Sequence, residues 1–454
     1  MATFGNPIVA SPNLLPSVAD VFSPSTAYSA GKYVYYGGKL YQFTADHAAG
    51  AWVGTDATEV KLADILSDLK SEIDAIEEII AAQDMTPLFI RNLVRQGKVQ
   101  QYFQIGDQID VPWMKGTTQY ILPFDVVSFE PVLCEGDTEP RPGMWLQSHY
   151  AVDGVMFDQC EAFYVAPEGG LEAGAYNVTF VEKWGQIAAN TTMEFTLTAD
   201  VPEGGMLVFN TGLPDKTAAA DVKLFVYANA TTQTASETCL LTAGSSGTSL
   251  GSVSTATKYG ASGLNNYQRA VYGYNRWSQS AIRQWLNSDQ PKNMWWTPKN
   301  EFDRAPAQLS TLDGFLAGFS ADFRSALGKV KVSTALNTTS DSEIGTTEDT
   351  YDWMFPASLE QEYIVPQLEG AEGAYWPYWK ERLGIDSPQA QGGAGALAEH
   401  IRYAYENHSS AQNDRLRSAY RGSANSAWLV NTTGGATTYS AATALRPAPA
   451  CVIC

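Results

Sequence analysis

Two cysteines near the end of the sequence, Cys451 and Cys454, have the C-x-x-C spacing of redox and metal-binding motifs. Such chemistry needs an activated thiolate, and no histidine lies near this pair in the sequence. We therefore do not expect this pair to catalyse a reaction. The other three cysteines, Cys134, Cys160 and Cys239, are scattered. An odd number of cysteines in a chain of this length does not predict a disulfide framework.

Other residue types that carry chemistry give little support for an enzyme. Paired carboxylates on a sugar groove would indicate a glycan-cleaving enzyme, and Glu360 and Glu362 are the candidates. Nothing singles them out, and we interpret them as surface charges. His149 has no second histidine nearby, so we interpret it as structural and not as a metal ligand. No phosphate-binding or dinucleotide fingerprint occurs, and the sequence predicts no catalytic residue, no metal site and no cofactor.

Residues 415–454 combine two kinds of position. The first kind is large, apolar or geometrically special, and we expect it to form a scaffold: Arg417, Gly422, Trp428, Val430, Pro449, Val452 and Ile453. Between Tyr420 and Arg446 most other positions are Ser, Thr, Ala, Asn, Tyr, Gly or Leu, with no Lys, Glu, Gln or Met. An AAC or AAT codon whose adenines are randomised can encode Ser, Thr, Ala, Asn, Tyr, Gly and Leu. It cannot encode Lys, Glu, Gln or Met, because its third base stays a pyrimidine.

The second kind of position is therefore predicted to be exchangeable and exposed for ligand binding. Its members are Tyr420, Ser423, Asn425, Ser426, Leu429, Thr432, Thr433, Ala436, Thr437, Thr438, Tyr439, Ser440, Ala442, Thr443 and Leu445. The alternative is a low-complexity Ser/Thr/Ala surface segment. A solvated linker would not carry Trp428 and an Ala-Cys-Val-Ile strand, which favours the exchangeable surface. Since 415–454 contains no acidic residue, its side chains cannot build a calcium site.

The stretches LRSAYRGSANSAWLVNTTGG and LRPAPACVI resemble the variable region of proteins diversified by retroelements. The resemblance implies a C-type-lectin-like domain, a fold shared with formylglycine-generating enzymes. It also implies a function, because the best-known relatives are phage receptor-binding proteins that determine host tropism. NRWSQSAIRQWLN, DGFLAGF and MFPASLEQEY resemble a domain of phage proteins that often precedes such a region. The resemblance covers 265–454 well and 92–240 more weakly.

An aromatic group upstream of the variable stretch has two possible roles. Its members either surround the exchangeable surface or belong to the core: Tyr375, Trp376, Tyr378, Trp379 and Tyr403. The sequence alone does not separate these alternatives.

Composition limits the classes of protein. A length of 454 residues suggests about three domains, and 12% aromatic with 17% charged residues favours a mainly β protein. The net charge of −20 argues against nucleic-acid binding and against docking on anionic lipid. The first residues lack the features of a signal peptide, and no apolar stretch approaches the ~20 residues of a membrane span. We expect synthesis in a bacterial cytoplasm and final location in a virion, at a tail tip or fibre.

The beginning of the chain predicts an arm and a small β module. Residues 1–26, rich in Pro, Ser and Ala, read as an arm that docks on other virion tail proteins. Within 27–60, Tyr33–Tyr36, a Gly37-Gly38 turn and Leu40–Phe43 predict a hairpin that Trp52 can cover. The pattern resembles small chitin-binding-type modules, with Tyr28, Tyr33, Tyr41 and Trp52 in the aromatic roles. The favoured alternative is that these aromatics are the module's own core.

Residues 61–83 predict a coiled coil. Six apolar residues are spaced alternately four and three apart: Leu62, Leu66, Leu69, Ile73, Ile76 and Ile80. Ile65 and Ile79 widen the apolar stripe, which favours three strands over two and predicts a homotrimeric stalk. An amphipathic helix packed on its own domain is the alternative. Pro87 is expected to end the helix.

The remainder predicts three further segments. Short apolar runs between turn signals over 84–242 indicate a β-sandwich or jelly roll, with strands at 175–180, 194–198 and 205–209 among others. Residues 243–258 read as a Gly/Ser/Thr linker. Residues 259–454 are assigned to the lectin-like variable domain, including a helix within 266–287, another around 312–319 and a strand at 330–333. The expected fold class is multidomain and mainly β, with an α+β C-terminal domain.

These observations predict a receptor-binding protein that presents a diversified surface to a host receptor, either protein or glycan. A structural virion decoration protein with the same fold is the second hypothesis. A cell-surface glycan-degrading enzyme is the third.

Overall fold

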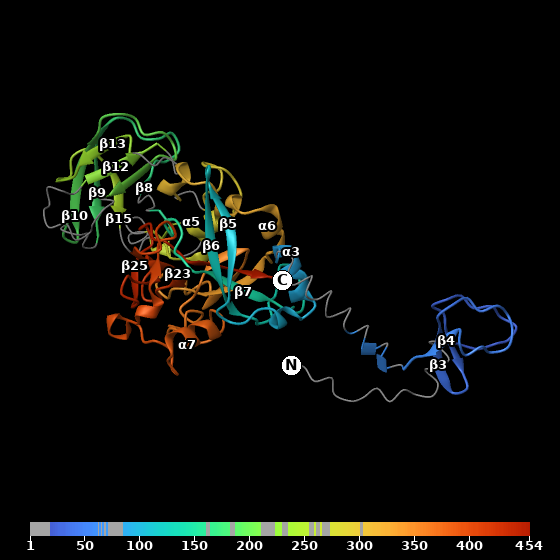
Figure 1. Cartoon of the computed structure of the whole chain (residues 1–454). Helices are drawn as coiled ribbons and strands as arrows, with labels where there is room; N and C mark the ends of the chain where they lie inside the picture. The colour runs from blue at the N-terminus through green and yellow to red at the C-terminus, as the bar shows by residue number, and fades with distance from the viewer. Residues whose placement is uncertain are drawn as a thin grey trace. The chain divides into compact units, whose positions relative to one another are not determined.

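A computed structural model describes residues 19–61, 63–64, 66–67, 70, 85–159, 164–181, 187–209, 223–228, 235–253, 258–259, 264–265, 273–299 and 303–454 (Figure 1). The chain divides into two compact units, 1–85 and 86–454. Both are built mainly from β-sheets, as the composition predicts. Within the described ranges, no helix has the length and apolar character needed to cross a membrane.

The first unit is one four-stranded sheet in the order β1-β2-β3-β4. Its strands are β1 (Asp20–Val21), β2 (Tyr33–Tyr36), β3 (Lys39–Phe43) and β4 (Ala57–Glu59). The predicted hairpin is confirmed: Tyr36 pairs with Lys39 across Gly37 and Gly38. Both glycines have positive φ, 57° and 83°, as a two-residue hairpin turn requires.

The aromatic residues of this unit are largely core. Tyr28 and Phe43 are buried and stack with ring centroids 5.1 Å apart, and Trp52 packs against the same cluster. Trp52 also stacks on Tyr36, with ring centroids 4.3 Å apart. The predicted stalk over 61–83 lies almost wholly outside the described residues. Of its apolar seam only Leu66 is described, in a helical position with its side chain half exposed.

The second unit begins with α3 (Pro87–Arg95). Pro87, which we predicted to end the preceding helix, occupies the first turn of this one. The end of the preceding helix lies outside the described residues. The N-cap is Thr86, whose side chain accepts from Phe89 N at 3.3 Å. The buried residues Ile90, Leu93 and Val94 form the apolar face of the helix. A 3₁₀ turn, η1 (Val99–Gln101), follows.

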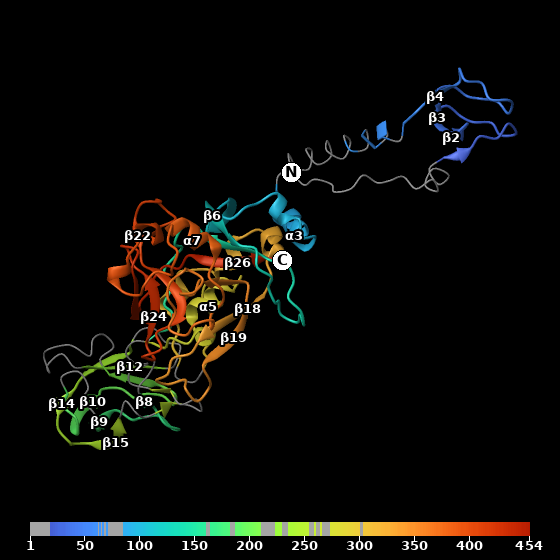
Figure 2. The same ribbon diagram turned by 90° about the horizontal axis from the view of Figure 1, so that it is seen from below.

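A five-stranded sheet joins segments that are far apart in sequence. Its strands, in the order β20-β26-β7-β6-β5, are β20 (Met354–Pro356), β26 (Pro449–Ile453), β7 (Met144–Ser148), β6 (Thr118–Ser128) and β5 (Gln108–Lys115). Ala450 pairs with Gln147, and Ile453 with Met144. Figure 2 labels β26 and β6, two strands of this sheet. All five residues of β26 and of β7 are buried, as expected for adjacent interior strands.

This pairing corrects the predicted boundary at 84–242. Strands β5, β6 and β7 do not belong to the sandwich, because β7 pairs with β26 and the β5–β6 hairpin extends the same five-stranded sheet through β7. The local sequence of β7 identifies a strand but carries no information about a partner as distant in the chain as β26.

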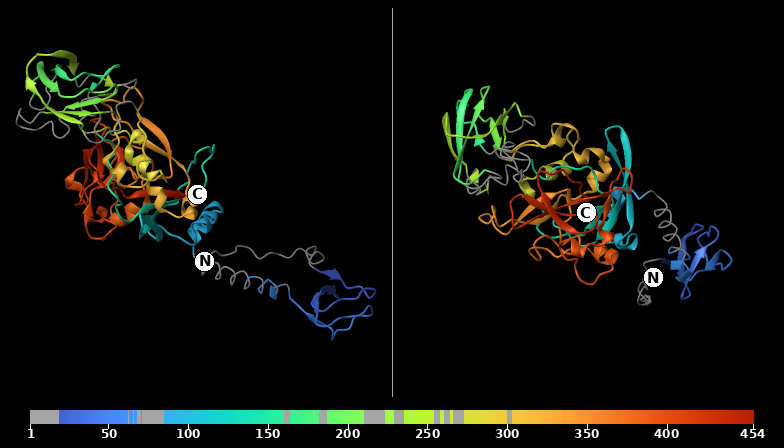
Figure 3. Two further views of the ribbon diagram at one scale, coloured as in Figure 1. Left: turned by 90° about the horizontal axis from the view of Figure 1, so that it is seen from above. Right: turned by 90° about the vertical axis from the view of Figure 1, so that its left-hand side faces the viewer.

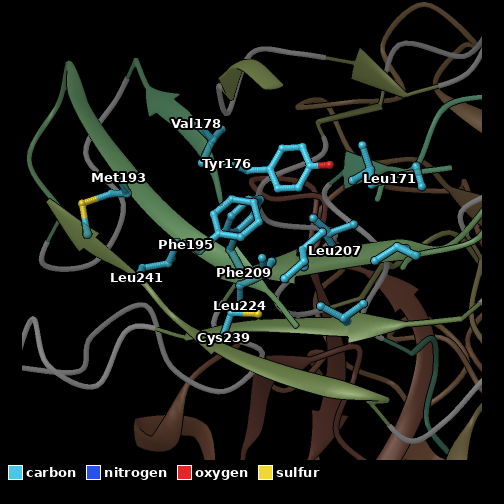
Figure 4. Close-up of a cluster of buried hydrophobic side chains, with 14 of the residues drawn as sticks. Leu171, Tyr176, Val178, Met193, Phe195, Leu207, Phe209, Leu224, Cys239 and Leu241 are labelled. Atoms are coloured by element: carbon cyan, nitrogen blue, oxygen red, sulfur yellow. The ribbon is translucent and has the colours of Figure 1, made fainter. Parts of the chain in front are cut away.

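The β-sandwich is instead formed by strands between 164 and 253. One sheet has the order β14-β10-β9-β15 and contains β14 (Thr242–Ala243), β10 (Thr191–Leu197), β9 (Gly174–Phe180) and β15 (Thr248–Val253). The other has the order β13-β12-β11-β8 and contains β13 (Glu237–Leu240), β12 (Lys223–Tyr227), β11 (Met206–Phe209) and β8 (Tyr164–Val165). Figure 4 shows side chains of both sheets converging, among them Tyr176, Phe195 and Leu207.

The predicted linker at 243–258 is wrong over its first half. β15 pairs in parallel with β9, Thr248 opposite Tyr176, and Leu250 packs against the sandwich core. Gly and Ser occur here because the backbones approach closely: a Cβ on Gly247 would lie 2.2 Å from Ala175 O. The Gly- and Ser-rich composition of this segment therefore reflects a strand whose backbone packs closely against its neighbour, and not a linker.

The rest of the second unit consists of short elements. In chain order they are β16 (Lys258–Tyr259), β17 (Leu264–Asn265), η4 (Trp277–Gln279), α5 (Ala281–Leu286), η5 (Ala307–Ser310), η6 (Phe315–Gly318), α6 (Ala321–Ala326), β18 (Val330–Ala335), β19 (Thr347–Asp352), α7 (Pro377–Leu383), η7 (Gly393–Gly395), η8 (Ala398–His400), β21 (Arg402–Tyr403), β22 (Ala411–Gln412), β23 (Asp414–Ala419), β24 (Ser426–Val430) and β25 (Ala436–Ser440). The strand expected at 330–333 is confirmed within β18. The helix expected around 312–319 is only the 3₁₀ turn η6. Of 266–287, positions 266–272 lie outside the described residues, and α5 forms the helical part of the rest.

Candidate binding surface on the three-stranded sheet

Strands β23, β24 and β25 form an antiparallel sheet, seen in red in Figures 1 and 3, that carries most of the variable stretch. Asp414 pairs with Val430, and Ser426 with Ser440, so that both connecting turns lie at ends of short strands. Between Arg415 and Ala419 the register shifts, which marks a bulge in β23. The surface of interest consists of this sheet, its two turns and the loop 441–445.

The scaffold residues are placed as predicted, with one exception. Trp428 is 5% exposed, and its Nε1 donates to Gln367 Oε1 at 3.1 Å. The remaining apolar members are buried: Val430, Pro449, Val452 and Ile453. Gly422 is exposed in the β23–β24 turn but does not have positive φ. Its constraint is steric, because a Cβ there would lie 3.0 Å from the Tyr420 ring.

The exchangeable positions are mainly accessible. Thr432, Thr433 and Tyr439 are exposed, with Tyr439 at 53%. Ten others are half-buried: Tyr420, Ser423, Asn425, Ser426, Thr437, Thr438, Ser440, Ala442, Thr443 and Leu445. Leu429 and Ala436 are buried, which contradicts the prediction for these two. Leu429 lies in a strand run that is buried throughout, and Ala436 is bridged to Gly392.

A buried arginine, Arg415, holds the backbone of this surface from beneath. Its Nη1 donates to Ala427 O at 2.9 Å and to Tyr439 O at 3.2 Å, and its Nη2 donates to Ser440 O at 2.9 Å and Thr443 O at 3.5 Å. Burial lowers the pKa of Arg415 to about 9, so that it stays charged at neutral pH. The arginine thus fixes main-chain atoms on β24, β25 and the following loop, whatever side chains those positions carry.

The β23–β24 turn is held by a buried asparagine from a distant segment. Asn275 Nδ2 donates to Ser423 O at 2.8 Å and Ser426 O at 2.7 Å, with a longer contact to Tyr420 O at 3.2 Å. Its backbone N donates to Ala424 O at 2.9 Å. Asn337 orients this amide by donating from Nδ2 to Asn275 Oδ1 at 3.0 Å.

The β24–β25 turn is restrained in the same manner. Gln389 Nε2 donates to Gly434 O at 2.9 Å, and the Gln389 side chain contacts His400 Nδ1. Burial lowers the pKa of His400 to about 3, so its ring is neutral, and its Nε2 lies 2.8 Å from Glu362 O. Gly434 has φ 83°, and a Cβ there would lie 1.8 Å from Leu397 O. This glycine is therefore required by both conformation and space.

The sequence did not lead us to predict Arg415, Asn275 or Gln389 as site residues. Arg415 carried a signal, because it lies two residues before Arg417 in the same strand. Asn275 and Gln389 carried none, since single amides far from the variable stretch are indistinguishable from surface residues until the fold brings them together.

Arg417 has the role that we expected. Its guanidinium is buried and donates to Pro356 O at 3.0 Å, and also to Gln361 Oε1 and Glu372 O. Burial lowers its pKa to about 10. Arg417 therefore fastens β23 to the segment that follows β20, in contrast to Arg415, which fastens the variable strands to each other.

Glu360 and Glu362 are not the surface charges that we predicted. Both are buried, at 2% and 0% exposure. The Glu360 carboxylate accepts backbone N–H groups of Gly370 and Glu372, and Glu362 Oε1 accepts from Gln147 Nε2 at 2.6 Å. Burial raises the pKa of Glu362. They serve as internal hydrogen-bond acceptors and do not line a sugar groove.

The aromatic group is largely core. Trp376, Tyr378 and Trp379 are buried, whereas Tyr375 is half-buried and Tyr403 is 37% exposed. Trp379 Nε1 donates to Gln147 Oε1 at 3.1 Å, which ties α7 to the five-stranded sheet. The core alternative therefore holds for these three residues.

The histidine and cysteine candidates lie elsewhere. His149 Nδ1 lies 2.9 Å from Asp125 Oδ2. Although burial opposes ionisation of Asp125, the hydrogen bond with His149 and the charge of Arg402 lower its pKa to about 2.

Cys451 is buried with a raised pKa, and Cys454 contacts Cys134 instead of Cys451. In the described part of the chain, no group of three or more His, Cys, Asp or Glu residues is arranged to hold a metal ion.

Comparison with known families gives one match. Residues 238–453 match a family described as a domain of unknown function, DUF6273. The matched range includes the whole three-stranded sheet but not β5, β6 and β7, which complete the five-stranded sheet. No curated protein matches the chain, and no solved structure matches it.

Proposed function

We propose that this protein is a phage host-recognition protein, which binds a cell-surface receptor through the surface formed by β23, β24, β25 and the loop 441–445. One observation carries the proposal: the backbone of this surface is held by residues outside the exchangeable set. Arg415, Asn275 and Gln389 all donate to main-chain carbonyls in it. Side chains on the surface can therefore change while the backbone stays in place.

The side chains themselves fit this division. None of the hydrogen bonds found among the described residues involves the side chains of Asn425, Ser426, Thr437 or Thr438. Their hydroxyl and amide groups are available for a ligand. Tyr, Ser, Asn and Thr form adaptable contacts at low ordering cost, as in antibody paratopes. A neutral surface of this kind suits either a protein or a glycan receptor.

The proposed domain is C-type-lectin-like, and its surface is proposed to act in three copies. The apolar seam from Leu62 to Ile80 would join the chains, and the arm at 1–26 would attach the trimer to other tail proteins. Three weak sites on one particle bind with enhanced avidity. Replacing Ile73 and Ile76 by Asp would cost several kcal/mol per trimer. Light scattering should then report single chains, and a monomeric wild type would contradict the stalk.

The proposed function is tested by exchanging surface residues together. In a triple variant, Thr437→Asn, Thr438→Asn and Tyr439→Ser, we expect altered or lost binding to host cells. The melting temperature should change little, because none of the three positions is buried and surface substitutions shift stability by about ±0.5 kcal/mol each. A double variant on the sandwich, Thr238→Asn with Leu240→Ser, is the matched control, since both positions are exposed. It should bind as the wild type does.

A scaffold variant separates binding from folding. Trp428→Ala should destabilise the protein by roughly 3–5 kcal/mol and abolish binding to every receptor. If the triple variant bound host cells unchanged while the sandwich variant did not, the binding surface would be misassigned. Binding to particles that lack this protein, without binding to cells, would indicate a decoration protein.

A further inference from the structure

Two cysteines that are far apart in the sequence of the second unit lie in contact. Cys134 follows β6, and Cys454 directly follows β26. Their Sγ atoms are 3.1 Å apart, and both residues are 2% exposed. The four described cysteines, which also include Cys239 and Cys451, are free thiols. Cys160 lies outside the described residues.

The surrounding backbone holds these thiols together. Cys134 is bridged to Val330, and Leu327 is bridged to Ile453, so that both cysteine segments flank the chain at 327–330. A Cβ on Gly328 would lie 2.2 Å from Cys454 Sγ and 3.1 Å from Cys134 Sγ. The glycine therefore leaves the space that the two sulfur atoms occupy. A disulfide bond would bring the two Sγ atoms from 3.1 Å to ~2.05 Å.

We propose that Cys134 and Cys454 form a redox-controlled cross-link, which a hydroperoxide of small size closes and a thiol reductant opens. The sequence motif Cys451-x-x-Cys454 is not the reactive pair. Side chains three residues apart along an extended strand point to opposite faces, and Cys451 is fully buried on the other side. The partner of Cys454 is determined by the fold.

The local charges favour reaction at Cys134. The hydrogen bond from the Cys454 thiol, together with Arg141 Nε at 3.2 Å from Cys134 Sγ, lowers the pKa of Cys134 to about 6. The same contact raises the pKa of Cys454, which keeps its proton. A thiolate beside a protonated thiol has the arrangement of an attacking and a resolving cysteine.

The reaction balances with one peroxide. The Cys134 thiolate attacks one oxygen of hydrogen peroxide, the O–O bond breaks, and the leaving hydroxide takes up a proton to become water. Cys454 Sγ then displaces hydroxide from the Cys134 sulfenic acid, and this hydroxide leaves as water with the Cys454 proton. The two thiols lose two electrons, and the peroxide is reduced to two water molecules.

The cross-link would secure the strand that completes the five-stranded sheet. β26 lies between β20 and β7, and it is joined to the variable sheet through Arg446 and the following residues. A bond at Cys454 ties the end of β26 to the segment between β6 and β7. Because it closes a very long loop, it should stabilise the folded state substantially.

The test is oxidation of the purified full-length protein with hydrogen peroxide. We expect the intact mass to fall by two hydrogen atoms and a non-reduced peptide map to join the peptides of Cys134 and Cys454. The melting temperature should rise by at least about 3 °C and return on reduction. Cys451→Ser is the matched control, and it should form the same cross-link.

Cys134→Ser and Cys454→Ser should each fold, as judged by circular dichroism, yet show no rise in melting temperature with peroxide. Should either variant fail to fold, the peptide map of the wild type decides the question. A map that joins Cys454 to Cys451, or one without any cross-link of Cys134, would overturn the proposal.

Discussion

The β-sandwich and the three-stranded sheet of β23, β24 and β25 are both built from short β-strands of one chain, but they are stabilised by different atoms. In the sandwich, side chains of two sheets pack on each other, with Phe195, Phe209 and Val226 almost completely buried. In the variable sheet, Arg415 and Asn275 bind backbone carbonyls. The stability of the sandwich therefore depends on which side chains its strands carry. The stability of the three-stranded sheet depends on a few hydrogen-bond donors that lie outside its exposed positions.

This difference explains how a surface can be sequence-tolerant without being mobile. Every residue has a backbone carbonyl, so a hydrogen bond donated to that carbonyl does not restrict which side chain the position carries. A buried phenylalanine, in contrast, constrains volume and shape at its own position. Each of the following predictions tests one side of the comparison.

The largest effect is expected in the sandwich core. Phe209→Ala should reduce the free energy of unfolding by about 3–5 kcal/mol, because it leaves a cavity among closely packed side chains. Leu240→Ala, at a position 53% exposed in the same sheet, should have little effect. Chemical denaturation measures both. Equal destabilisation by the two variants would show that side-chain packing does not dominate in this region.

The next effect concerns the arginine beneath the variable sheet. Arg415→Met preserves length but removes every donor, leaving the carbonyls of Ala427 and Ser440 without this partner. We expect a loss of roughly 3 kcal/mol in the free energy of unfolding and loss of receptor binding. Arg421→Met, at a half-buried arginine in the β23–β24 turn, is the control and should be nearly neutral. A stable Arg415→Met protein that still bound receptor would contradict main-chain restraint.

A smaller effect is expected at the β23–β24 turn. Asn275→Ala should cost about 1–3 kcal/mol, since several buried carbonyls lose their donor. Amide hydrogen exchange at 421–426 should become faster while exchange in the sandwich stays unchanged. Asn425→Ala, within the turn itself, should alter neither. Unchanged exchange in Asn275→Ala would mean that the turn is held by its own residues.

The smallest effect is expected from metal removal. Since residues 415–454 contain no acidic side chain, receptor binding should persist in the presence of a calcium chelator. A cell-binding assay with and without chelator measures this. Loss of binding that added calcium restores would place a metal in the site and contradict the prediction.

Local patterns allowed much of the secondary structure to be predicted. The hairpin at 33–43 followed from two glycines between alternating apolar runs, because such turns depend on φ at two residues only. Most of the positions predicted to be exchangeable are also exposed or half-buried, whereas Trp428 and Val430 are buried. Leu429 and Ala436 were wrongly predicted to be exposed. Residue type alone indicates which amino acids a mutated codon can encode, and it does not indicate which face of a strand a residue occupies.

By itself, the sequence determined many of the segments that form strands, because turn chemistry and strand periodicity are local properties. Only the tertiary structure decided which strands pair and which polar groups meet. It joined Ala450 to Gln147, directed Asn275 to the carbonyls of a distant turn, and placed Cys454 against Cys134 instead of Cys451. These contacts link residues separated by about 150 to 320 positions. Their selection depends on the burial of whole sheets, which no short window of sequence contains.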